Sequence, residues 1–220
     1  MESIPDPIKT YFGYGSNLWL DQMSRRCPSS PFTGVGRLRG YQWIINARGY
    51  ANITKTNSSA DEVWGLIYEL TPEDEERLDI NEGVPEAYEK RIINVEFWDK
   101  GTLLRDNSES RESTAEIPPP ASVEGMLVYI DFKRSSGEGN KPKAEYVHRM
   151  NEGIRDALKE GVPRSYIDRV LRAYIPAEHE ADHTAKELAL KQAVSFVDES
   201  GVITRTGSGA GVKQQQHGSS

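Results

Sequence analysis

The chain has 220 residues, with 27 basic against 34 acidic side chains and a formal net charge of −7. This length is enough for a domain with a buried core, and the acidic balance argues against partners that are recognised through a phosphate backbone. A single cysteine excludes an internal disulfide, and no stretch approaches the roughly 18 apolar residues of a membrane span. The start, MESIPDPIKT, lacks the basic and apolar regions of a secretory signal. We therefore expect a cytoplasmic protein without nucleic-acid or membrane partners.

Six runs of residues alternate apolar and polar side chains in the manner of β-strands. They cover residues 8–12, 35–47, 50–56, 63–70, 88–98 and 123–132. The connections are mostly short, and the glycines inside the runs suit bulges or barrel corners. The pattern predicts an antiparallel or mixed sheet that curls toward a barrel.

Helical signals dominate the second half of the chain. Thr71 and Pro72 followed by acidic residues indicate a helix start, and Gly83 ends that helix. Further helices are expected over residues 144–159, from Pro163 onward, and over about 177–198, where a thin apolar stripe indicates a surface position. Strands early and helices late predict an α+β fold.

The expected organisation is a single domain over residues 1–200. Its core covers about 9–176, the surface helix follows, and residues 201–220 form a flexible tail of low complexity. Two polar stretches, 99–121 and 133–143, have the composition of loops and are expected to leave the body as insertions.

Residues 11–18 read YFGYGSNL, a strand end that runs into a glycine-rich turn. Alternate glycines let another group approach the backbone closely, and the free N–H groups of such a turn can bind a carboxylate or a developing oxyanion. A tight turn without any ligand explains the same residues. A nucleotide-binding P-loop is not indicated, because no Gly-Lys-Ser/Thr follows.

YFGYGSNL also resembles the signature of the gamma-glutamylcyclotransferase family. Other segments resemble the family in the same order along the chain: DEVWGLIYEL at residues 61–70, DINEGV at residues 79–84 with Tyr88 soon after, and Tyr146 followed by Gly153, Gly161-Val162-Pro163 and Tyr166. The resemblance spans about residues 9–176 and leaves out the two polar insertions.

The resemblance implies a small mixed or antiparallel β-barrel flanked by helices. It implies a lyase that converts the γ-glutamyl group of γ-glutamyl amino acids, peptides or conjugates into 5-oxoproline and releases the amine, with no metal and no cofactor. By the same resemblance Glu82 is the general acid/base, and the substrate is held by Tyr11, Phe12, Gly13, Tyr14, Gly15, Ser16, Asn17 and Tyr146. The partner is a small γ-glutamyl compound. Leaving-group specificity and oligomeric state stay open, with a homodimer as one option.

The chemistry of lactam closure fits these residues. The substrate's own amine attacks its γ-carbonyl, so an enzyme needs mainly to enforce that geometry and to move protons. One carboxylate can take a proton from the ammonium group and return one to the leaving nitrogen. Glu82 is expected at the C-terminal end of a helix, where the helix dipole and partial burial raise the pKa of its carboxyl. A solvated glutamate on an acidic helix face is the alternative.

For three other residues, an interpretation without any catalytic or binding role is also available. Tyr146 is equally typical of a packed aromatic side chain, and Tyr88 is expected in the core or at its rim. Cys27 follows Arg25 and Arg26, which can lower the pKa of its thiol, but no general base is identifiable beside it. We assign Cys27 no role.

Residues 179–183 read His-Glu-Ala-Asp-His, which formally matches a zinc-protease helix. The flanking residues are charged and small, as expected for a solvated helix face. A zinc hydrolase that uses His179, Glu180 and His183, with Glu199 as a third ligand, is therefore the lesser alternative. The other alternative is a relative that binds γ-glutamyl compounds without turning them over.

Overall fold

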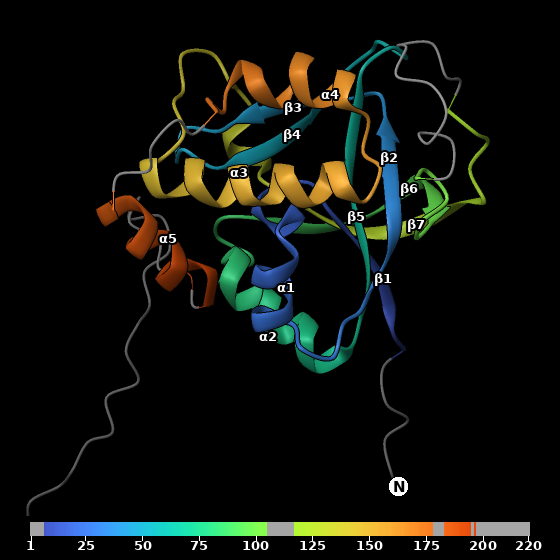
Figure 1. Cartoon of the computed structure of the whole chain (residues 1–220), viewed down its shortest axis with the longest axis horizontal. Coiled ribbons are helices and arrows are strands. Elements are labelled where there is room, and N and C mark those ends of the chain that lie inside the picture. The colour runs from blue at the N-terminus through green and yellow to red at the C-terminus, as the bar shows by residue number, and fades with distance from the viewer. Residues whose placement is uncertain (1–6, 105–116, 178–182, 195, 197–220) are drawn as a thin grey trace, which may run out of the picture.

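The computed structural model describes residues 7–104, 117–177, 183–194 and 196 (Figure 1). The strands are β1 Lys9–Gly13, β2 Phe32–Arg39, β3 Tyr41–Ile45, β4 Ala51–Lys55, β5 Glu62–Leu70, β6 Glu89–Asp99 and β7 Ser122–Ile130. The helices are α1 Leu20–Arg26, α2 Pro72–Glu82, α3 Ala144–Lys159, α4 Arg164–Arg169 and α5 His183–Val194.

Within the described residues, five of the strands close into a barrel in the order β1-β5-β2-β6-β7. The pair β1 and β7 is parallel and the other neighbouring pairs are antiparallel. The mixed barrel with flanking helices that the sequence predicted is therefore confirmed. The run over residues 35–47, however, is two strands, because Gly40 turns the chain with a φ of +73°. After this turn β3 pairs with β4 in a separate two-stranded sheet outside the barrel.

Two glycines allow the barrel to close tightly around Phe12, which is fully buried. A Cβ on Gly65 of β5 would lie 2.5 Å from the carbonyl oxygen of Gly13 and 2.6 Å from the Phe12 ring. A Cβ on Gly36 of β2 would lie 2.6 Å from a methyl group of Ile67. The absence of these side chains lets β1 pack against β5, and β1 leads directly into the glycine-rich turn.

Helix α2 begins and ends where the sequence predicted. Thr71 accepts a hydrogen bond from the N–H of Asp74, and Pro72 occupies the first turn. Gly83 ends the helix in the left-handed conformation with a φ of +66°. Since Glu82 is the last residue of α2, these local signals fix its position relative to the helix end.

The helices flank one side of the barrel (Figure 1). Helix α3 has the predicted bounds and runs between the β3–β4 sheet and α1, with Met150, Ile154 and Ala157 fully buried. The helix predicted from Pro163 is the short α4 followed by a 3-10 turn at Leu171–Ala173. None of the helices in the described ranges is long and apolar enough to cross a membrane.

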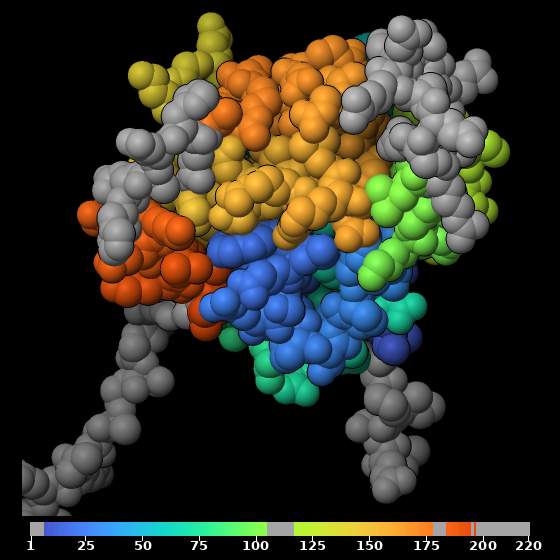
Figure 2. Space-filling model, in the orientation of Figure 1, coloured from blue at the N-terminus to red at the C-terminus, as the bar shows by residue number. Residues whose placement is uncertain are grey.

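The C-terminal helix differs from its prediction. It was expected over about 177–198 as a surface helix, and the structure has α5 at His183–Val194 with Ala189, Gln192 and Ala193 buried against neighbouring helices. Figure 2 shows its atoms lying directly against those of α1 and α3. The apolar stripe of α5 is thin because its residues are small. Small residues allow close packing against other helices, so the thin stripe does not indicate exposure. The predicted tail, 201–220, lies outside the described residues.

The two polar stretches are only partly insertions. β6 extends to Asp99, and Leu103 is buried, while residues 105–116 lie outside the described residues. In the second stretch Asp131 caps a 3-10 turn at Phe132–Arg134 by accepting from two backbone N–H groups. Local capping thus orders a segment whose composition is that of a loop.

Candidate active site

A single cavity brings together segments that are far apart in the sequence. The end of β1, the turn after it, α1, the end of α2, the start of β4, α3 and the residue Phe196 all reach its wall. The lining residues are Tyr11, Tyr14, Gly15, Ser16, Asn17, Arg26, Arg48, Tyr50, Ala51, Asn81, Glu82, Tyr88, Tyr129, Tyr146, Arg149 and Phe196.

The glycine-rich turn approaches α3 closely. Gly15 precedes a 3-10 turn over Ser16–Leu18, and the N–H of Leu18 donates to the carbonyl of Gly15 at 2.9 Å. A Cβ on Gly15 would lie 2.9 Å from the hydroxyl oxygen of Tyr146. Glycine at this position therefore allows the turn and the tyrosine to share one wall of the cavity.

Two residues expected to bind substrate do not line the cavity. Neighbouring side chains of a strand point to opposite faces, so Tyr11 faces the cavity while Phe12 fills the barrel. Gly13 pairs with Leu66 of β5 and packs against Asn17. The structure assigns Phe12 and Gly13 to barrel packing, and this corrects the prediction for both.

Glu82 and the turn line the same cavity and are joined by a hydrogen bond. The Nδ2 of Asn17 donates to the Oε1 of Glu82 at 3.0 Å and to the hydroxyl of Tyr11 at 2.7 Å. The amide cannot be reversed, because its Oδ1 accepts from Gln22 at 2.8 Å and from Arg26 at 3.2 Å. Asn17 thereby fixes the Glu82 carboxylate next to the glycine-rich turn.

Burial raises the pKa of the Glu82 carboxyl above its ordinary value. The Arg26 guanidinium, the hydrogen bond from Asn17 and the Arg48 and Arg149 guanidiniums oppose this shift without reversing it. Arg26 is itself buried, which lowers its pKa to about 10. The carboxyl is thus shifted toward the range in which a group can both accept and return a proton near neutral pH.

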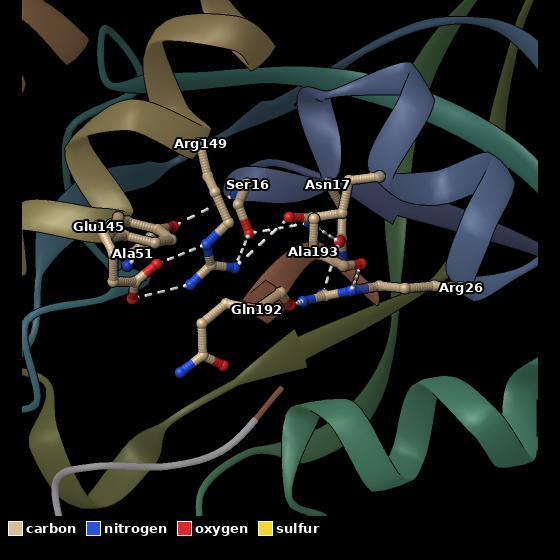
Figure 3. Close-up of polar contacts among 10 residues, drawn as sticks. Ser16, Asn17, Arg26, Ala51, Glu145, Arg149, Gln192 and Ala193 are labelled. Atoms are coloured by element: carbon tan, nitrogen blue, oxygen red, sulfur yellow. Dashed lines mark hydrogen bonds and ion pairs between the residues drawn. The ribbon is translucent and has the colours of Figure 1, made fainter. Parts of the chain in front are cut away.

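Arg149 of α3 connects the turn to a buried ion pair. Its guanidinium donates to both carboxylate oxygens of Glu145, at 2.8 and 3.1 Å, and to the hydroxyl oxygen of Ser16 at 3.1 Å (Figure 3). Both side chains of the pair are almost fully buried. The pair fixes a positive charge beside the turn.

Three hydroxyls in the cavity accept hydrogen bonds from the protein. The hydroxyl of Tyr146 accepts from the N–H of Ser16 and of Ala51, both at 3.2 Å. That of Ser16 accepts from Gln22 and Arg149, and that of Tyr11 accepts from Asn17. No acceptor for any of the three hydroxyl hydrogens occurs among the described residues, so each hydrogen is available to a ligand.

Two other tyrosine hydroxyls donate hydrogen bonds to the protein instead of accepting them. The hydroxyl of Tyr14 donates to the carbonyl of Tyr129 at 2.6 Å, and that of Tyr88 donates to the carbonyl of Ala51 at 2.7 Å. Because a hydroxyl has one hydrogen, these oxygens can only accept from a ligand. The cavity therefore suits a small molecule with carboxylate oxygens, which accept hydrogen bonds, and an amine, which donates them.

Comparison with known proteins decides the family. The family model described as "Gamma-glutamyl cyclotransferase, AIG2-like" matches residues 11–130, which include the turn and Glu82. The chain belongs to the gamma-glutamyl cyclotransferase, AIG2-like family. The gamma-glutamylcyclotransferase of mouse is 35% identical over 169 residues, covering 69% of this chain and 88% of the mouse protein. That of cattle is 26% identical over 174 residues, covering 71% and 90%.

Solved structures share the fold of this family member. A structure named gamma-glutamyl cyclotransferase has a TM-score of 0.57 at 21% identity and covers 83% of this chain and 98% of its own. A human protein solved as an uncharacterized protein has a TM-score of 0.58 at 21% identity, with coverage of 84% and 99%.

Sequence reasoning missed several cavity residues of this gamma-glutamyl cyclotransferase-like chain. Arg26, Arg48 and Arg149 carry its positive charge, and Tyr50 and Phe196 form an aromatic wall. Arginines and aromatic residues are common on helices and strands, so their type alone gave no signal. Among the cavity residues outside the predicted site, the sequence pointed only to Tyr88, which follows the DINEGV segment and lines the cavity.

The two arginines that precede Cys27 do not lower the pKa of its thiol, which agrees with the assignment of no role to this residue. Its thiol is buried against α2, and burial raises its pKa to about 12, with Asp74 adding to the effect and Arg26 opposing it. The His-Glu-Ala-Asp-His segment cannot be compared in the same way: residues 178–182 and 199 and the side chain of His183 lie outside the described residues.

Proposed function

We propose that this protein is a gamma-glutamylcyclotransferase in which Glu82 moves the protons of lactam closure. The observation that carries the proposal is the position of the Glu82 carboxyl, which lies in the same cavity as the glycine-rich turn and 3.0 Å from the Asn17 amide of that turn. Its substrates are γ-glutamyl amino acids, peptides or conjugates, and its products are 5-oxoproline and the free amine.

The first step is deprotonation and attack. Glu82 takes a proton from the α-ammonium group of the γ-glutamyl substrate, and the free amine attacks the γ-carbonyl carbon. The carbonyl oxygen becomes an oxyanion as the lactam ring forms. The donors that would stabilise it are the hydroxyl hydrogen of Tyr146 and the N–H of Gly15, which donates no hydrogen bond within the described residues.

The second step breaks the amide. Glu82 gives its proton to the leaving nitrogen, and the regenerated carboxylate takes the second proton of the nitrogen that formed the ring. The bond between the γ-carbon and the leaving nitrogen breaks, and the second proton passes from Glu82 to the released amine, which leaves as an ammonium ion. The products are 5-oxoproline and an amine, and no water is consumed. Glu82 acts first as base and then as acid, which suits a carboxyl with a raised pKa.

The charge of the cavity supports an anionic substrate. Among the described residues, three guanidiniums, from Arg26, Arg48 and Arg149, line the cavity, whereas Glu82 supplies the one carboxylate that lines it and Glu145 pairs with Arg149 beside it. A γ-glutamyl amino acid is a net anion at neutral pH. The excess positive charge therefore offsets the loss of solvation of its carboxylates.

The experiment is the substitution Glu82→Gln, with release of 5-oxoproline from γ-glutamyl-alanine as the measurement. We expect kcat to fall by about 10²-fold or more, because an amide cannot transfer the protons. Glu76→Gln, an exposed position on the same helix, is the matched control and should keep wild-type kcat. Wild-type turnover by the Glu82→Gln enzyme would remove Glu82 from the mechanism.

A further inference from the structure

The C-terminal helix α5 reaches the cavity although it lies outside the segment matched by the family model. The guanidinium of Arg26 donates to the carbonyls of Ala193 at 3.0 Å and Gln192 at 2.7 Å (Figure 3). These carbonyls are at the C-terminal end of α5, where a helix has unpaired acceptors and a partial negative charge. A cavity arginine from α1 thus anchors the end of α5.

Phe196, just beyond α5, is fixed at the cavity wall by two further contacts. Its N–H donates at 3.1 Å to the side chain of Asn81, the residue before Glu82. Its ring meets that of Tyr50 edge-to-face, with centroids 5.2 Å apart, and the Arg149 guanidinium lies 5.6 Å from it. The side chain is only 8% exposed.

The cavity is lined by polar groups and by the two rings of Tyr50 and Phe196, which contact each other. The turn, Glu82 and the hydroxyls of Tyr11 and Tyr146 supply polar groups. The glutamyl part of a substrate carries an amine and a carboxylate, and these charged groups need polar partners. The part of the substrate beyond the amide bond then lies against the rings of Tyr50 and Phe196.

We propose that α5 and Phe196 form the leaving-group wall of the site, and that Phe196 with Tyr50 favours substrates whose leaving group carries an aromatic side chain. The orientation of the substrate rests on the proposed function. The wall itself rests on the contacts of Phe196 with Asn81, Tyr50 and Arg149. Edge-to-face and stacked rings stabilise one another beyond their buried area, so a third ring has a matching surface here.

The test measures binding without turnover, in the Glu82→Gln protein. Dissociation constants for γ-glutamyl-phenylalanine and γ-glutamyl-alanine are determined by calorimetry with and without Phe196→Ala. We expect the phenylalanine compound to bind about five- to tenfold more weakly after the substitution, and the alanine compound to change less than twofold. Leu190→Ala, at an exposed position of α5, is the control and should change neither constant.

Phe196→Leu separates the aromatic contact from the packing of α5. Leucine keeps an apolar side chain against the wall, so α5 stays in place, but it removes the ring. We expect Phe196→Leu to lose most of the preference for the phenylalanine compound. If neither Phe196 variant changes the ratio of the two constants, or if Phe196→Ala improves binding of the phenylalanine compound, the proposal is wrong.

A parallel measurement keeps this proposal separate from the proposed function. The wild-type protein is assayed for 5-oxoproline release with the same two compounds. Selective binding that depends on Phe196, without any release, would refute the proposed function and leave the leaving-group wall standing. If neither compound binds to the Glu82→Gln protein, both proposals fail.

Discussion

At the scale of single residues, Asn17 positions the carboxyl of Glu82, the proposed acid/base. Its side chain makes four hydrogen bonds, accepting from Gln22 and Arg26 and donating to Tyr11 and Glu82. All the donor and acceptor capacity that faces these neighbours is used, so the amide has one orientation. Asn17 touches the carboxyl that we propose as catalytic, helps to hold its position, and opposes the rise of its pKa that burial causes.

Asn17→Asp tests this role through pH dependence. The new carboxylate would place an oxygen where Nδ2 now donates to Glu82, and two like charges at this distance disfavour ionisation of both groups. We expect the acidic limb of the kcat/KM profile for γ-glutamyl-alanine to move to higher pH, because Glu82 must be ionised to accept a proton. Asn57→Asp, at an exposed position, should leave the profile unchanged. A limb that stays at the wild-type pH would argue against a contribution of Asn17 to the pKa of Glu82.

At the scale of elements, the position of the turn depends on how β1 packs in the barrel. β1 pairs with β5 on one side and with β7 on the other, and the turn follows directly from its last residue, Gly13. The close approach of β1 to β5 requires Gly65, whose added Cβ would lie 2.5 Å from a backbone oxygen. A shift of β1 would carry the whole turn with it.

Gly65→Ala therefore has an expected effect on both stability and activity. The obstructing atoms belong to backbone and to a buried ring, which cannot move aside, so we expect a loss of about 2–4 kcal/mol in the free energy of unfolding. Denaturant unfolding measures this loss, and kcat/KM should fall as well. Gly125→Ala in β7 is the matched control: its Cβ would meet a methyl of Ile92, which is 65% exposed and free to adjust, and would lie at an ordinary 3.9 Å from the Oδ1 of Asn94. Equal stability of the two variants would contradict the packing argument.

At the scale of the whole molecule, folding places the Glu82 carboxyl where its ionised form is disfavoured. Its pKa is raised by burial in the folded state above the value in the unfolded chain. The resulting stabilisation is fully present below the unfolded pKa and is lost as the pH rises through the folded pKa. Above the folded pKa the ionised Glu82 therefore lowers the stability of the fold.

Thermal unfolding of the Glu82→Gln protein tests this cost. Glutamine keeps the shape and removes the charge, so we expect a higher Tm than the wild type at pH 8 and a similar Tm at pH 4, where both side chains are neutral. Each kcal/mol corresponds to about 2–4 °C for a chain of this size. Glu76→Gln on the exposed face of α2 should show no such pH dependence. A difference in Tm that is the same at both pH values would contradict the linkage.

Local structure around the site was largely predictable from the sequence. The capping residues of α2 and the glycine-rich turn after β1 are encoded by neighbouring residues, because caps and turns satisfy nearby backbone groups. The same local rules place Glu82 at a helix end. They do not distinguish the barrel strands from β3 and β4, since all of these strands alternate apolar and polar residues in the same way. Between barrel strand β2 and strand β3 there is only one residue, Gly40.

By itself, the sequence determined the turn, the helix that ends at Glu82 and a resemblance that the family comparison then confirmed. Tertiary structure alone decided that Asn17 meets Glu82, 65 positions away, and that guanidiniums from α1 and α3 face the same cavity. It also brought Phe196 beyond α5 onto the wall. The reason is physical: periodicity and capping report interactions within a few residues, whereas these contacts exist only once β1 is held between β5 and β7 and the helices pack on the barrel.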